Sequence, residues 1–209
     1  MSKNKPTNKI EAQGDLHFAI VASRYNERHV EHLLERVKTQ LRNKGIPANA
    51  ITVTRVPGAN EIPYVTSLLS LTGDYDCIIA LGVIIAGETP HHEIIANSTA
   101  NAFHKIGIDS QIPVINGVIV TMNEAQADER VFGKTDRGTE FANAAIEMAI
   151  LGNKLADYLE ELDKNDLERE RREEILGNMS IDDNNGGDDD DDGDNNDFFG
   201  DSRKPFHRN

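Results

Sequence analysis

Residues 75–93 read YDCIIALGVIIAGETPHHE, and this stretch decides how the rest of the sequence is interpreted. It contains an uninterrupted apolar run, Cys77–Leu81, which is typical of a strand buried on both faces. A glycine-containing loop is predicted from Gly82 onward. Pro90 then opens a helix predicted over 90–106, because the missing N–H of a first-turn proline costs nothing there. The stretch therefore predicts a strand, a loop and a helix in that order.

The same alternation continues on both sides of this stretch. Further strands are predicted from apolar or β-branched runs at Phe18–Ser23, Ile51–Val56 and Pro113–Val120. Further helices are predicted at 29–44, 61–71, 124–132 and 138–151, the last of them open to continuation through the charged residues 157–174. Strands that alternate with helices indicate an α/β fold with a parallel sheet and helices on both of its faces.

Ligands bind at the carboxyl ends of the strands in sheets of this kind, which directs attention to the loops after residues 23, 56, 82 and 120. The first of these loops carries Arg24-Tyr25-Asn26, and the second reads VPGANEIP over 56–63. The third contains GETP at 87–90, at a helix start whose N–H groups and positive dipole end favour an anion. His91 follows within the first helical turn, and its imidazole is suited to proton transfer.

Charge divides the chain into regions. The net charge is −14, and residues 176–209 hold ten Asp against three Lys or Arg, so that half of it lies in these last 34 residues. Such an acidic chain is a poor candidate for binding nucleic acid. We expect a flexible arm at 1–15, a folded domain at 16–175 and a disordered acidic tail at 176–209, because the tail has too few apolar residues to form a core.

Several classes of site and location are disfavoured by the sequence. The single cysteine, Cys77, excludes an internal disulfide and is expected to be a small core residue. Adjacent His91 and His92 would point about 100° apart on a helix, so a metal pair is not expected. No G-x-G-x-x-G or P-loop motif occurs. No apolar run approaches the roughly 20 residues of a membrane span, and the N-terminus lacks a secretory apolar region, so we expect a cytoplasmic protein.

The loops, taken together and in order, resemble the lumazine synthase family. The resemblance runs from about Phe18 to Met148, and its motifs are SRYNE (23–27), VPGANEIP (56–63), the stretch 75–93, PVINGV (113–118), EAQADER (124–130) and AAIEMA (144–149). It implies a flavodoxin-like three-layer αβα sandwich with a central four-stranded parallel sheet. It also implies the condensation of 5-amino-6-(D-ribitylamino)uracil with 3,4-dihydroxy-2-butanone 4-phosphate to 6,7-dimethyl-8-ribityllumazine, without a metal or other cofactor.

The resemblance assigns roles to individual residues. Tyr25 would stack on the pyrimidine ring, and His91 would move protons as the catalytic residue. The ribityl chain and the pyrimidinedione edge would be held, in part by backbone groups, by Ala59, Asn60, Glu61, Val83, Ile84 and Ile85. The phosphate would be bound by Gly87, Glu88, Thr89 and Arg130. Asn116 and Arg130 would come from a neighbouring subunit, so that the site would exist only in a homo-oligomer.

The sequence departs from the family pattern at several of these positions. Position 60 is usually aromatic, position 116 commonly Phe and position 86 commonly Arg, where this chain has Asn60, Asn116 and Ala86. Glu88 also places a carboxylate beside the expected phosphate. These departures keep open an alternative in which the chain is a catalytically impaired shell or a flavin- or lumazine-binding protein. A generic flavodoxin-like phosphate binder is a third interpretation.

The sequence alone does not decide the size of the assembly or the role of the tail. The family forms pentamers, some of which pack into a 60-subunit icosahedral shell, and the short loop 133–138 is compatible with either. Riboflavin synthase is the candidate cargo of such a shell. The tail residues 188–196 partly match a calcium-binding loop, but position 12 of the motif is Phe199 rather than Glu, so a solvated acidic tail is the favoured interpretation. The apolar and basic residues 198–206 could form a docking peptide.

Overall fold

The computed structural model describes residues 15–134 and 136–182. The chain divides into two units, and the boundary lies between Lys154 and Leu155. The expected arm, apart from Asp15, and the tail residues 183–209 lie outside the described residues, as do the calcium-loop match and the possible docking peptide. The first unit holds every strand of the described part of the chain.

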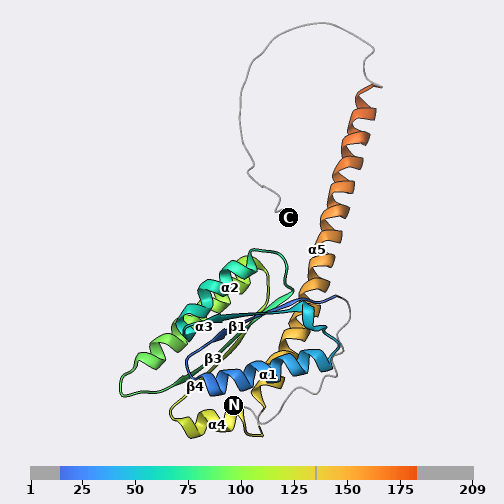
Figure 1. Ribbon diagram of the computed structural model, residues 1–209. Helices are drawn as coiled ribbons and strands as arrows, with labels where there is room; N and C mark the ends of the chain where they lie inside the picture. Colours follow the sequence, from blue (N-terminus) through green and yellow to red (C-terminus); the bar gives the residue numbers. More distant parts are fainter. Residues whose placement is uncertain (1–14, 135, 183–209) are drawn as a thin grey trace. The chain divides into compact units, whose positions relative to one another are not determined.

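Four parallel strands form the centre of this first unit (Figure 1). They are β1 (Phe18–Ser23), β2 (Ile51–Val56), β3 (Cys77–Ile85) and β4 (Val114–Thr121). Their spatial order is β2-β1-β3-β4, which matches the first four strands of a flavodoxin-like sheet. The chain moves outward from β1 to β2 on one side and to β3 and β4 on the other. The reversal of strand order, where such sheets bind ligands, therefore lies between β1 and β3.

Helices cover both faces of the sheet (Figure 1). The described helices are α1 (Glu27–Asn43), α2 (Ile62–Ser70), α3 (His91–Ser110), α4 (Glu124–Val131) and α5 (Arg137–Asp182), with short 3₁₀ turns η1 (Ala48–Ala50) and η2 (Ala59–Glu61). One apolar core joins the sheet to α1, α4 and the first part of α5. A second core on the opposite face joins it to α2 and α3. This arrangement confirms the expected three-layer αβα sandwich.

Helix α1 shows how the sequence produces these layers. Its buried positions include Val30, Leu33, Val37 and Leu41, which recur at the spacing of one helical face and turn toward β1 and β3. The helix ends as predicted before Gly45, whose φ of 94° suits a residue without a side chain. The N–H of Gly45 donates to the carbonyl of Arg42 at 2.9 Å, which closes the last turn.

Three element boundaries differ from the predicted ones by four or more residues. β3 continues to Ile85, so Val83, Ile84 and Ile85 belong to a strand and not to the predicted loop. α3 continues to Ser110, four residues beyond the predicted end. α5 continues to Asp182, so residues 176–182, which were assigned to the disordered tail, are helical. In each case the strand pairing or the helix continues past a glycine, a residue that locally favours the end of a strand or helix.

The second unit consists, where it is described, of the continuation of α5 from Leu155. Most side chains described there are exposed, and charged residues predominate from Asp163 onward. Ion pairs between neighbouring turns, such as Lys164 with Glu160 at 2.7 Å, support the helix locally. No helix in the described part of the chain is long and apolar enough to cross a membrane.

Candidate functional site

The turn after β1 is tied to the loop after β2 through backbone hydrogen bonds. The N–H of Arg24 donates to the carbonyls of Val56 and Pro57, at 2.9 and 3.1 Å, and the N–H of Tyr25 donates to Pro57 at 3.1 Å. The side chain of Tyr25 is not used in this packing, since the residue is 73% exposed. The turn therefore presents an aromatic ring to the outside at the carboxyl edge of the sheet.

Asn26 links this same turn to β3. Its side-chain Nδ2 donates to the carbonyl of Val83 at 2.7 Å. Its own carbonyl accepts from the N–H groups of His29 and Val30, which begins α1. Asn26 makes both sets of contacts in a left-handed conformation, with φ of 54° and ψ of 44°, which Asn tolerates better than most residues.

The loop after β2 brings Tyr25 and Glu61 together around Gly58. The N–H of Gly58 donates to Oε2 of Glu61 at 2.8 Å. A Cβ on Gly58 would lie 2.9 Å from that oxygen and 3.3 Å from the Tyr25 ring, so a side chain there would displace the Glu61 carboxylate or the ring. The second carboxylate oxygen of Glu61, which is exposed, is 3.5 Å from Nδ2 of Asn60. A carboxylate and an aromatic ring thus border one small area.

The end of β3 extends beyond β1. The pairing of these strands ends at Ala22 with Leu81, whereas the pairing of β3 with β4 continues to Ile85 with Thr121. The N–H of Ile78 points to the β4 side, where it donates to Pro113. Because adjacent residues of a strand alternate in the side to which their backbone groups point, Val83 and Ile85 direct theirs to the β1 side, as the Asn26 bond confirms.

The loop from Ala86 to Pro90 follows. The N–H of Ala86 donates to the carbonyl of Thr121 at 2.8 Å, which fixes the start of the loop to β4. Within the described residues, the N–H groups of Gly87, Glu88 and Thr89 donate to no protein acceptor. A Cβ on Gly87 would meet nothing within 4 Å, so this backbone borders open space. Three unused donors before a helix start form a suitable cradle for an anion.

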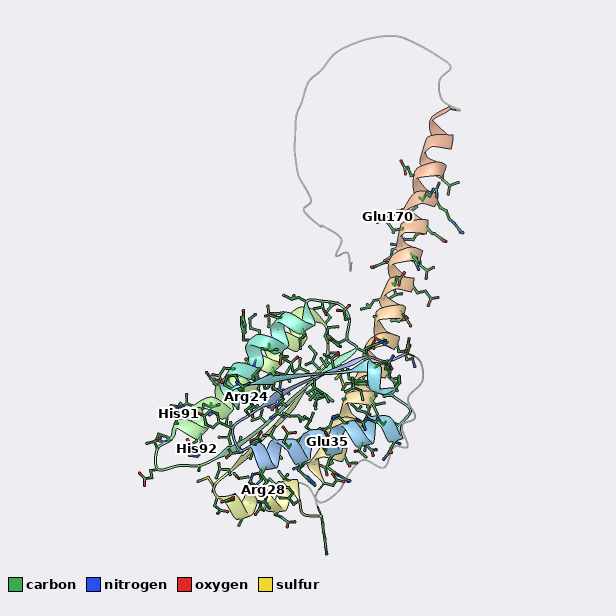
Figure 2. The ribbon with its side chains drawn as sticks, in the orientation of Figure 1. Arg24, Arg28, Glu35, His91, His92 and Glu170 are labelled. Atoms are coloured by element: carbon green, nitrogen blue, oxygen red, sulfur yellow. The ribbon has the colours of Figure 1, made fainter. Side chains whose placement is uncertain are left out.

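The two histidines at the start of α3 differ in their surroundings. His91 is exposed, whereas the His92 side chain is only 9% exposed and its Nδ1 lies 3.1 Å from the carbonyl of Thr89. That contact assigns the proton to Nδ1, because a carbonyl only accepts. Figure 2 shows His91 and Arg24 at the same end of the unit. His91 therefore lies exposed in the first turn of α3, directly after this loop.

Unused polar atoms gather at this edge. Among the described residues, the buried side-chain atoms without a hydrogen-bond partner include Oγ of Ser23, Oγ1 of Thr121 and Nε2 of His92. Ser23 ends β1, Thr121 ends β4 and His92 lies in the first turn of α3. Buried polar groups are nearly always paired, so these atoms carry hydrogen-bonding capacity that the folded chain does not itself use.

Two expected site residues are not brought to this place within one chain. Asn116 pairs with Ala80 in the middle of the sheet, five residues before the end of β4, and its Oδ1 accepts from the N–H of Val118 at 3.1 Å. Arg130 lies on α4, on the sheet face covered by α1 and α5, and its Nη1 donates to the carbonyl of Gln126 at 3.1 Å. Within the described residues, no carboxylate pairs with Arg130.

Cys77 does not contribute to this edge. It lies at the start of β3, at the opposite end of the strand, and it is fully buried. Burial raises the pKa of its thiol well above the ordinary value, with a smaller effect of the neighbouring Asp76 carboxylate in the same direction. The expectation of a core cysteine is confirmed. The described residues also contain no cluster of side chains that could hold a metal ion.

Sequence reasoning missed Asn26 as an organiser of the site. Its signal was available: an Asn directly before a helix, after an aromatic residue, tolerates a left-handed backbone and can bond to neighbouring main chain. The buried unpaired atoms of Ser23, Thr121 and His92 were also missed. They had no signal in the sequence, because burial of a hydroxyl or a ring depends on residues far along the chain.

Comparison with known proteins gives a consistent result. The model of the 6,7-dimethyl-8-ribityllumazine synthase family matches residues 15–153, so the match ends next to the boundary of the first unit. A protein of that name from Chlorobaculum tepidum is 43% identical over 141 residues, which are 67% of this chain and 91% of the relative. Relatives of the same name from Azoarcus sp. and Salinibacter ruber are 39% and 38% identical, over 65% and 68% of this chain and 85% and 96% of their own lengths.

Proposed function

The chain belongs to the 6,7-dimethyl-8-ribityllumazine synthase family, and from this membership we propose how its carboxyl edge binds the two substrates of the family reaction. The enzyme is a transferase of riboflavin biosynthesis. It condenses 5-amino-6-(D-ribitylamino)uracil with 3,4-dihydroxy-2-butanone 4-phosphate, and releases 6,7-dimethyl-8-ribityllumazine, phosphate and water. The observation that carries the site assignment is the group of unused backbone donors at 87–89 beside the exposed His91.

The uracil substrate binds between the turn after β1 and the free end of β3. The exposed Tyr25 ring stacks on the flat heterocycle. The heterocycle edge, which has both donors and acceptors, is read by backbone groups of Val83 and Ile85, since β3 has no β1 partner at these positions, and Ile84, whose backbone groups point to β4, joins the two. This proposal makes use of the strand extension that the sequence did not predict.

The ribityl chain lies along the 3₁₀ turn η2. Glu61 is held by Gly58 through Oε2, and its Oε1 faces the side chain of Asn60 at a longer distance. A carboxylate oxygen in this position accepts hydrogen bonds from sugar hydroxyls. The backbone of Ala59 and Asn60 supports the same chain of hydroxyls, and the Asn60 amide adds a polar group where an aromatic residue is usual in the family.

The phosphate binds at the loop before α3. The N–H groups of Gly87, Glu88 and Thr89 donate to its oxygens, and the helix start of α3 adds a favourable field. Arg130 supplies the positive charge. Because Arg130 and Asn116 lie away from this loop in their own chain, we assign both to the site of a neighbouring copy, within a homo-oligomer that is a pentamer or a 60-subunit shell.

The chemistry asks little of the protein. The amino group of the uracil substrate attacks the ketone, so the nucleophile comes with the substrate. The protein holds the two reactants in place. In well-oriented systems such alignment lowers the barrier of a bimolecular step by about 7 kcal/mol or more. His91 takes up and returns protons while the imine forms and the phosphate leaves. A cytoplasmic location and riboflavin synthase as a cargo of the assembly complete the proposal.

The test is product formation by the full-length chain from the two substrates, followed by the absorbance of the lumazine. Steady turnover that is inhibited competitively by a non-reactive substrate analogue supports the proposal. Binding of the lumazine without any turnover at high enzyme concentration would instead support the interpretation as a binding protein or inactive shell, which the residues Asn60, Ala86 and Asn116 motivate.

A further inference from the structure

A buried histidine on α1 bonds to the helix that carries Arg130. The His29 side chain is 5% exposed, and its Nε2 lies 2.9 Å from Oδ1 of Asp128 on α4. Arg28 donates to the same oxygen through Nη1 at 3.1 Å. Since an ionised carboxylate only accepts, the proton of this contact is on Nε2 of His29. One oxygen of Asp128 is thus held by two donors from consecutive residues of α1.

The same part of α1 also holds the end of α4 through an aromatic contact. The ring of Phe132, directly after α4, lies 5.3 Å from the ring of His29 and 4.7 Å from that of His32, measured between ring centroids. The guanidinium carbon of Arg28 lies 4.4 Å from the centroid of Phe132. These distances are within the range of favourable aromatic and cation–π contacts. α4 is therefore fixed to α1 at two successive points.

Helix α4 needs such contacts because it is short. It has eight residues, and among them only Ala127 and Val131 are buried. Two small apolar contacts restrain the distance of a helix from its neighbour better than they restrain its rotation. Asp128 and Arg130 are two residues apart, which places them about 200° apart around the axis. A bond that fixes Asp128 toward α1 therefore fixes Arg130 on the opposite side of α4.

We propose that His29 and Arg28, acting through Asp128, are positioning residues that orient Arg130 toward the phosphate bound by a neighbouring copy. The inference rests on the proposed role of Arg130 in phosphate binding. His29 and Arg28 touch neither substrate. They act by fixing the rotation of α4 about its axis. The Asp128 bond also offsets the cost of burying the His29 imidazole on an otherwise apolar face of α1.

The experiment measures KM for each substrate in the full-length enzyme with four variants. Arg130→Ala is expected to raise KM for the butanone phosphate about tenfold or more. His29→Leu is expected to raise the same KM about threefold to tenfold, and Asp128→Ala by at least as much because it removes the acceptor of both donors. KM for the uracil substrate changes less than twofold in each. His29→Gln, whose amide nitrogen can replace Nε2, stays within twofold of wild type.

A double variant separates positioning from general damage. If His29 acts through Arg130, then adding His29→Leu to Arg130→Ala has no further effect on KM for the butanone phosphate. His104→Leu is the matched control, since it changes the same residue type at an exposed position of α3, on the opposite face of the sheet from α1 and α4, and it should leave both constants unchanged. Asp128 is a partly exposed surface residue, so Asp128→Ala provides the test even where His29→Leu does not fold.

Two results would overturn the inference, and they distinguish failure of the proposed function of Arg130 from failure of the positioning role alone. An unchanged KM for the butanone phosphate in Arg130→Ala removes Arg130 from the phosphate site, and with it the proposed function of that residue. A raised KM in Arg130→Ala, together with the same fold increase from His29→Leu in both backgrounds, keeps the phosphate role of Arg130 but shows that His29 does not act through it.

Discussion

The side-chain nitrogen of Asn26 lies 2.7 Å from the carbonyl oxygen of Val83, and this contact joins the turn after β1 to the end of β3. It spans the place where the strand order reverses. The bond has two consequences for the edge. It fixes the turn that carries Tyr25 relative to β3. It also occupies one acceptor of the β3 backbone, while the segment near Ile85 lies beyond the last residue that pairs with β1.

His91 is expected to speed the reaction without being indispensable to it. Because the nucleophile belongs to the substrate and alignment remains intact, His91→Ala should lower kcat about 10-fold to 100-fold, at or below the low end of general acid–base effects. Both KM values should change little. The measurement is steady-state lumazine formation at saturating substrates, and His104→Ala, an exposed histidine farther along α3, is the matched control. An unchanged kcat would remove His91 from its assigned role.

The Arg36–Asp136 pair predicts a pH dependence of stability. Arg36 donates to the Asp136 carboxylate, through Nε at 3.2 Å and also through Nη2, and this bond holds the pKa of Asp136 below its ordinary value. A carboxyl whose pKa is lowered by folding stabilises the native state above its unfolded pKa of about 3.9, and this contribution is lost as pH falls through the folded pKa.

Arg36→Met tests this dependence while keeping the apolar stem of the side chain. The variant should be less stable than wild type at pH 6, and the difference should narrow as the pH is lowered below about 3.9. Urea unfolding at a series of pH values provides the free energies. Thr139, whose N–H and hydroxyl also bond to Asp136, keeps part of the effect in the variant. A difference that is constant from pH 6 to pH 2 would show that the pair contributes through packing alone.

Two glycines of α5 should respond in opposite ways to alanine. A Cβ on Gly138 would lie 2.5 Å from Cβ of Arg36 and 3.2 Å from the carbonyl of Leu33, so α1 and α5 could not keep their present approach. A Cβ on Gly152 would make only an ordinary contact of 3.6 Å with Pro113. Gly138→Ala should therefore destabilise by about 1–3 kcal/mol, whereas Gly152→Ala should be neutral or stabilise by up to about 1 kcal/mol.

Thermal and urea unfolding of both alanine variants would measure these changes. The two substitutions have the same effect on the unfolded chain, so their difference reports the packing of α1 against the start of α5. Equal behaviour of the two variants would show that α5 moves away from α1 at little cost.

Local sequence patterns were sufficient for most of the fold. The strands Phe18–Ser23 and Ile51–Val56 were predicted with the bounds that the structure shows, because the first run is bordered by polar residues and the second is a β-branched run that ends at Pro57. The end of β3 was not, since Gly82 resembles the start of a loop. Pairing with β4, which continues to Thr121, keeps the residues after Gly82 in the strand, and that pairing joins segments more than thirty residues apart.

For the site, too, features set by local patterns or topology could be predicted, and contacts between distant residues could not. The loops that meet at the carboxyl edge could be predicted because every parallel strand ends there, which is a property of topology rather than of particular contacts. The Asn26–Val83 and His29–Asp128 bonds could not be predicted, because they join residues 57 and 99 positions apart. No local pattern distinguishes a histidine that bonds to a distant carboxylate from one that is merely tolerated on a helix.

The chain has one cysteine, and the fold encloses it completely at the start of β3. Its thiol is therefore shielded from maleimides while the protein is native. A cysteine introduced on an exposed position, such as Glu147 of α5, would be the single site that takes up a fluorophore. Energy transfer between copies labelled in this way could report directly how many of them gather and how far apart they stand.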